Sequence, residues 1–93
     1  MAVGIRLKFD GGTQDNYDVA HGVMEIDTDP PAGMIVHSSG PIEGGWGVID
    51  FWESRAHFDS FFGKHVAPAV QASGMEGPPP EIHEFPVHEY YKS

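Results

Sequence analysis

The chain has 93 residues, 40% of them hydrophobic and 12% aromatic, which predicts one globular domain over residues 1–93. Lys and Arg total 5 against 14 Asp and Glu, and the net charge of −9 disfavours nucleic acid and anionic membrane surfaces as partners. The sequence has no cysteine, which excludes disulfides and thiolate chemistry, and no apolar run that could span a bilayer, so we expect a cytoplasmic protein.

The first half of the chain predicts a strand, a helix and a hairpin. Alternating apolar and charged residues predict a strand over 3–9. A helix over 14–25 follows, with Thr13 as its N-cap. Two runs rich in β-branched and aromatic residues then predict strands over 34–39 and 46–53, joined by a turn into an antiparallel hairpin.

The second half predicts a helix and a final strand. Ser54 is the expected N-cap of a helix whose apolar stripe comprises Phe58, Phe61, Phe62, His65, Val66 and Ala69. Pro68 has no backbone N–H to donate, so we expect a kink or an early end of this helix near it. A Pro/Gly-rich linker leads to a strand over 81–91, which Pro86 places at a sheet edge or at a bulge.

The resulting order, β-α-β-β-α-β, predicts an α+β, ferredoxin-like fold with an antiparallel sheet and both helices on one face. The strands over 34–39 and 46–53 carry apolar residues on both faces, so the face without helices needs a cover. A second copy of the sheet is the simplest cover, and a short chain gains buried area by self-association. We therefore expect a homodimer.

The run 48–61, in which Trp52-Glu53-Ser54 precedes the helix, resembles the strand-to-helix junction of the dimeric α/β-barrel superfamily. That superfamily includes the antibiotic-biosynthesis-monooxygenase (ABM) domains, and residues 80–88 are similar to its last strand. The resemblance implies a homodimer whose two sheets close into a barrel, with a cavity between each sheet and its helices. Members with known activities include cofactor-free oxygenases of aromatic polyketides, haem-degrading oxygenases, and isomerases or cyclases.

The haem-degrading members place an Asn in the first strand, a Trp in the second helix and a haem-ligating His farther along that helix. In this sequence the first strand has no Asn, Phe61 stands at the position of the Trp, and the ligand position falls near Gln71. These departures from the pattern argue against haem, and we expect no cofactor.

His37 is the leading candidate for chemistry. It lies in the middle of a strand among apolar residues, so we expect it to face a covered interior, where an imidazole can act as a general base on a phenol or an activated C–H. The alternative is a core histidine held by a hydrogen bond. Asp50 on the neighbouring strand would orient the base if both share a face, but a slip of one residue would separate them, and a purely structural aspartate is an equal alternative.

Four further residues are candidates for binding a substrate: Tyr17, Trp52, Phe61 and His65. His65 falls in the apolar stripe of the second helix, beneath the sheet. Each of the four could instead only pack, and for Trp52 packing is the favoured interpretation. No spacing among the six histidines predicts a metal site.

The leading functional hypothesis is a small cofactor-independent, monooxygenase-like enzyme that acts on an aromatic or apolar metabolite, with His37 as its base. One alternative is a non-catalytic ligand-binding or interaction module on the same barrel, and another is a cyclase or isomerase. A closed cavity with His37 in its wall would favour an enzyme, whereas a filled barrel would favour the binding module.

Overall fold

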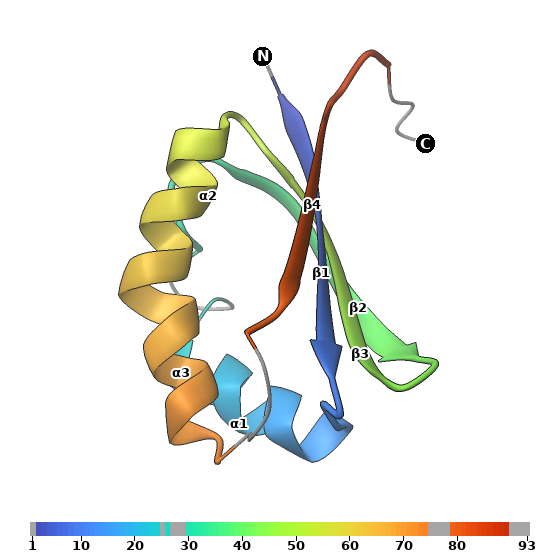
Figure 1. The fold of residues 1–93 in the computed structure, drawn as a ribbon. Coiled ribbons are helices and arrows are strands. Elements are labelled where there is room, and N and C mark those ends of the chain that lie inside the picture. Colours follow the sequence, from blue (N-terminus) through green and yellow to red (C-terminus); the bar gives the residue numbers. More distant parts are fainter. Residues whose placement is uncertain (1, 25, 27–29, 75–78, 90–93) are drawn as a thin grey trace.

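A computed structural model describes residues 2–24, 26, 30–74 and 79–89 of the chain. Its elements confirm the predicted ferredoxin-like order, and all the helices lie on one face of a single sheet (Figure 1). The elements are β1 (Val3–Asp10), α1 (Gln14–Met24), β2 (Met34–Ile42), β3 (Gly45–Trp52), α2 (Arg55–Phe61), a π-helical turn (Phe62–Val66), α3 (Ala67–Ala72) and β4 (Glu81–Pro86).

The sheet is antiparallel throughout, in the order β2-β3-β1-β4. β4 is an edge strand, as Pro86 predicted, but it ends at that proline: residues 87–89 lie outside the strand, and 90 and 91 lie outside the described residues. β2, at the other edge, is longer than predicted and runs through Gly40 and Pro41 to Ile42. A proline is tolerated there because an edge strand does not need every backbone donor.

Both helix starts agree with the sequence. Thr13 Oγ1 accepts a hydrogen bond from the backbone N–H of Asn16 (3.1 Å), and Ser54 Oγ accepts one from His57 (3.2 Å). Each cap pairs one of the N–H groups that the first turn of a helix leaves without a partner.

The helix after Ser54 does not end near Pro68, as one of the two expected outcomes required. It widens into the π-helical turn, where the N–H of Ala67 bonds to the carbonyl of Phe62, and continues as α3 to Ala72. The five-residue spacing removes the need for Pro68 to bond to Lys64, so the helix continues past the proline.

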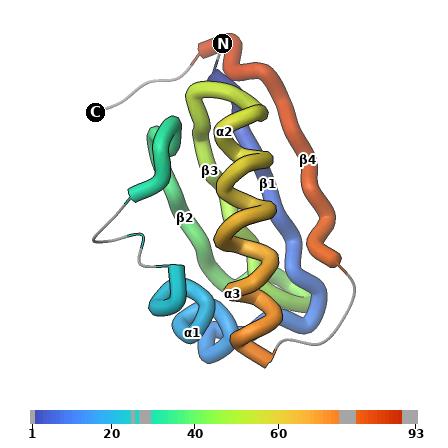
Figure 2. Tube along the Cα trace, turned by 90° about the vertical axis from the view of Figure 1, so that its left-hand side faces the viewer, coloured from blue at the N-terminus to red at the C-terminus, as the bar shows by residue number. Residues whose placement is uncertain are grey.

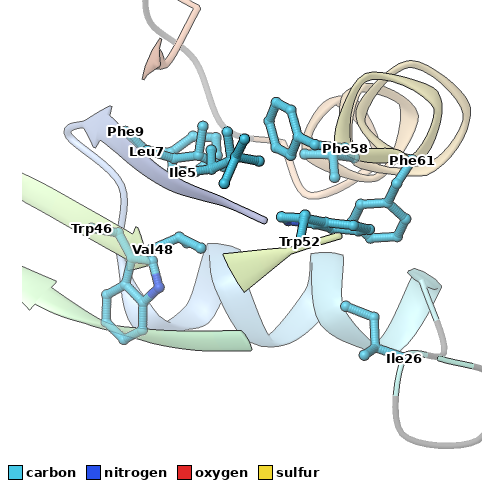
Figure 3. Packing of buried hydrophobic residues seen from close by; sticks show 11 residues of the cluster. Ile5, Leu7, Phe9, Ile26, Trp46, Val48, Trp52, Phe58 and Phe61 are labelled. Atoms are coloured by element: carbon cyan, nitrogen blue, oxygen red, sulfur yellow. The ribbon is translucent and has the colours of Figure 1, made fainter. Parts of the chain in front are cut away.

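The core lies between the helices and the central strands. Figure 2 shows α2 and α3 running over β3 and β1, and Figure 3 shows aromatic residues of α2 meeting alternate residues of these strands. Trp52 is fully buried, with its ring 5.9 Å from that of Phe58 and 5.3 Å from that of Phe61. Among the described residues, Asp50 is the one charged side chain buried in this layer.

The opposite face of the sheet is open in the single chain. Its exposed apolar side chains are those of Val36, Ile42, Ile49 and Phe85. Phe51 and Phe85 meet edge to face, 6.4 Å apart, across Gly4 of the strand between them. A Cβ at Gly4 would overlap the Phe85 ring, so this close approach requires glycine. None of the helices in the described residues has the length and apolar character needed to cross a membrane.

Candidate functional site

The hairpin register brings the two leading candidates together. β2 and β3 are joined by a two-residue turn at Glu43 and Gly44, so Ile42 pairs with Gly45 and, five residues farther from the turn, His37 pairs with Asp50. Directly paired residues of an antiparallel ladder point to the same face of the sheet. Asp50 is 3% exposed and faces the helices, and His37 therefore does as well.

Three side chains from three elements form a continuous hydrogen-bonded line. His37 Nδ1 lies 2.7 Å from Asp50 Oδ1, and His37 Nε2 lies 2.7 Å from the Tyr17 hydroxyl of α1. The Asp50 side chain is 4% exposed and that of His37 is 18% exposed. The line therefore begins at a carboxylate excluded from water and becomes more accessible toward α1.

The chemistry of the partners fixes the direction of these bonds. An ionised carboxylate only accepts hydrogen bonds, so the proton between Asp50 and His37 belongs to Nδ1. Nε2 then holds a lone pair and accepts from the Tyr17 hydroxyl. Asp50 thus keeps His37 in the tautomer whose second nitrogen can take a proton, and it would stabilise the imidazolium that forms.

This line forms part of the wall of a cavity between the sheet and the helices. Tyr17, His37, Asp50 and Phe61 all contribute to the wall, and its other residues are hydrophobic. The free volume is about 50 Å³. Complete ligand pockets usually measure about 300–1,000 Å³, so in this chain a substrate can place only a small group inside.

Two predicted substrate-binding residues lie elsewhere. His65 is exposed and stacks against the outer side of Phe61, at a ring distance of 5.6 Å, so its expected position beneath the sheet is wrong. The π-helical turn explains the difference, because its extra residue per turn gives the inward position to Val66. Trp52 is buried among core aromatic residues and is not part of the cavity wall.

Sequence reasoning treated Tyr17 only as a possible donor to substrate and did not connect it to His37. Its ring is nearly parallel to that of His37 (11°) and lies 5.4 Å from that of Trp46. Trp46 also belongs to the cavity wall and was not a predicted site residue. The helical spacing that turned Tyr17, Ala20 and Met24 inward was the available signal, but it could not identify the facing residue.

A larger hollow of about 430 Å³ lies on the open face of the sheet, with Arg6, Lys8 and Ile49 among its lining residues. It is separated from the His37 line by the sheet and contains no comparable pairing of acid and base. In the described ranges, no three His, Asp or Glu side chains come together in a way that would hold a metal ion.

Solved structures share the whole architecture of the chain. Rv0793 from Mycobacterium tuberculosis superposes with a TM-score of 0.70 at 14% identity, covering 99% of this chain and 100% of its own. SnoaB, a cofactor-independent oxygenase from Streptomyces nogalater, gives 0.65 at 11%, covering 99% and 97%. A candidate antibiotic biosynthesis monooxygenase from Deinococcus radiodurans gives 0.67 at 10%, covering 100% and 98%. The chain has the ABM fold.

The expected resemblance is therefore confirmed at the level of the fold. No protein-family model matches the sequence, and no curated protein matches it either. Proteins of this fold differ in what they hold, since MhuD has been solved with two manganese protoporphyrin IX molecules per active site, at a TM-score of 0.61 and 18% identity.

The residues of this chain do not fit a haem. Gln71, at the position expected for the haem ligand, is exposed on α3, and Phe61 takes the place of the tryptophan in the cavity wall. His65, the histidine nearest in sequence, lies outside the cavity. A cavity of about 50 Å³ is also far smaller than the pockets that enclose large ligands.

Proposed function

We propose that the protein is a small cofactor-independent, monooxygenase-like enzyme that removes a proton from an aromatic or apolar metabolite. The observation that carries this proposal is the line from Asp50 through His37 to Tyr17 in the wall of an apolar cavity. A buried carboxylate that orients an imidazole, which in turn accepts from a hydroxyl, is the arrangement of an activated base. The neighbouring oxygenase SnoaB supports the same class of chemistry.

The geometry assigns a separate role to each group. Because Tyr17 already occupies His37 Nε2, the Tyr17 oxygen is the atom of the line that meets the substrate. As the substrate proton moves to that oxygen, the tyrosine proton moves to Nε2, and Asp50 stabilises the resulting imidazolium. His37 thus remains the base, as predicted, but acts through Tyr17.

We also propose that the protein works as a homodimer through its open sheet face. Four apolar side chains there, including Ile49 and Phe85, are between 42% and 48% exposed, and the face lies on the central part of the sheet. Contiguous apolar patches of this kind mark interaction surfaces in soluble proteins. A second copy would cover them with an identical face.

The proton-transfer role can be tested without knowing the natural substrate. The wild-type protein is incubated in D₂O with a panel of aromatic ketones and phenols, and hydrogen–deuterium exchange at their acidic C–H positions is followed by NMR. We expect accelerated exchange, reduced about 10²–10⁴-fold by Tyr17→Phe and by His37→Gln. His65→Gln is the matched control, since this exposed histidine lies outside the cavity, and it should exchange like the wild type.

Oxygen uptake measured on the substrates that exchange separates an oxygenase from an isomerase or cyclase. The small cavity volume favours a second candidate, a non-catalytic module that binds part of a small apolar molecule. Saturable binding of panel members with no exchange above the buffer rate would support the module and contradict the enzyme.

A further inference from the structure

The cavity wall contains one polar group that the proton line does not use. Trp46 is 8% exposed, and its indole Nε1 has no hydrogen-bond partner among the described residues. Figure 3 shows this nitrogen on the edge of the ring that faces Val48 and the rest of the buried cluster. Native proteins leave few buried donors unpaired, because an unpaired donor costs about 1–3 kcal/mol, so this N–H requires a partner.

Trp46 and Tyr17 reach the cavity side by side. Their rings are 5.4 Å apart and stacked at 30°, and both residues belong to the same wall. A molecule that brings an acidic C–H to the Tyr17 oxygen therefore places its neighbouring atoms near the Trp46 N–H. The apolar remainder of the wall offers no competing acceptor, apart from Asp50 and His37, which bond to each other.

We propose that Trp46 Nε1–H binds the carbonyl oxygen of the substrate, which is therefore an enolisable ketone with an apolar or aromatic body. This inference rests on the proposed function and specifies its substrate class. The C–H bond next to the carbonyl breaks, and its proton passes to the Tyr17 oxygen while the tyrosine proton passes to His37 Nε2. The electron pair left on carbon forms a C=C bond, and the carbonyl pair moves to oxygen, giving an enolate.

The Trp46 N–H is placed to stabilise the charge that develops on that oxygen. A fixed donor in a site shielded from water strengthens its hydrogen bond as the oxygen becomes negative, which lowers the barrier to proton removal. Trp46 would thus act on the oxygen while Tyr17 acts on the carbon.

The chain supplies its own matched control. It contains two tryptophans, and Trp52 Nε1 is also buried without a partner in the described part of the chain, but Trp52 does not line the cavity. The two indole N–H signals in a ¹H–¹⁵N NMR spectrum can be assigned with either Trp46→Phe or Trp52→Phe. The probes are acetophenone, which is an enolisable ketone, and ethylbenzene, which has nearly the same shape without the oxygen.

We expect acetophenone to move the Trp46 signal downfield and leave the Trp52 signal in place, and ethylbenzene to cause no downfield shift. Acetophenone should bind roughly 3- to 10-fold tighter than ethylbenzene, the contribution of one hydrogen bond. This preference should persist in Trp52→Phe and disappear in Trp46→Phe. If Trp46→Phe does not fold, the wild-type titration, assigned with Trp52→Phe, still decides the question.

The proposal is overturned if acetophenone binds without moving the Trp46 signal, if its preference survives Trp46→Phe, or if it does not bind up to its solubility limit. An unmoved signal would mean that water alone pairs with the indole. Because this test measures binding, it fails separately from the exchange assay. A Trp46 response without exchange leaves the ketone site standing and removes the enzyme, and exchange without a Trp46 response does the reverse.

Discussion

Replacing His37 by leucine should destabilise the fold more than replacing its partner Asp50 by leucine. His37→Leu leaves the Asp50 carboxylate, whose side chain is 4% exposed, without its hydrogen bond in an apolar layer. Asp50→Leu leaves a neutral imidazole that is 18% exposed and still bonds to Tyr17. The two halves of one interaction thus have unequal consequences.

The burial of each group gives the magnitudes. Breaking a buried ion pair by removing one partner costs about 3–5 kcal/mol, and access of water from the His37 side places His37→Leu near the lower end, about 3 kcal/mol. Asp50→Leu should cost about 1–2 kcal/mol, the effect of one lost hydrogen bond. The double variant, which places two apolar groups in contact, should lose less than His37→Leu alone, with a coupling energy of about 2–3 kcal/mol.

Urea unfolding followed by circular dichroism measures these differences, at one fixed protein concentration because self-association would shift the midpoint. A 93-residue domain has a stability of about 5–14 kcal/mol, so all three variants should remain folded in buffer. With a slope of about 1–3 kcal/mol per molar urea, His37→Leu should lower the midpoint by about 1–3 M. Additive losses in the double variant, or a larger loss for Asp50→Leu, would refute the reasoning.

Three other predictions test other parts of the molecule. Ile49→Asp, at a 47% exposed position on the open face, should convert a species of twice 10.2 kDa in sedimentation into one of 10.2 kDa; a wild-type monomer would contradict the dimer. Ser54→Ala should cost about 0.5–2 kcal/mol in urea unfolding by removing the cap of α2, whereas Ala at the exposed Ser60 should be nearly neutral; equal losses would exclude the cap as the cause. Titration with haemin should give no saturable Soret shift, and a one-to-one complex would show that the cavity opens far more than its volume indicates.

The order of elements was predictable because each one carries its own local signal. Alternation identified β1, the caps Thr13 and Ser54 located the two helix starts, and Pro86 identified an edge strand. Such signals depend on a few neighbouring residues, so one sequence contains them. They predict which elements form and, through the ferredoxin-like order, how they are arranged.

The site was less predictable because it depends on alignment between elements. His37 and Asp50 were identified individually, but their pairing depended on a turn that proved shorter than the expected 40–45. The inward position of Val66 in place of His65 arises from the π-helical turn, which a regular helical period cannot anticipate. The bond from Tyr17 joins α1 to β2, and no local pattern encodes a contact between them.

The β2–β3 register shows how remotely the site is determined. β2 contains a bulge between Met34 and Val36; a regular ladder extended from the Met34–Trp52 pair would place Val36 opposite Asp50 and turn His37 to the open face. The bulge absorbs one residue, so the loop before β2 can vary without moving His37. The hairpin turn has no such allowance, and its Gly44 carbonyl is bonded to the N–H of Gly11 at 2.8 Å. One residue inserted in that turn would abolish the site while leaving every residue of it in the sequence, so loop grafts on this scaffold must preserve hairpin length.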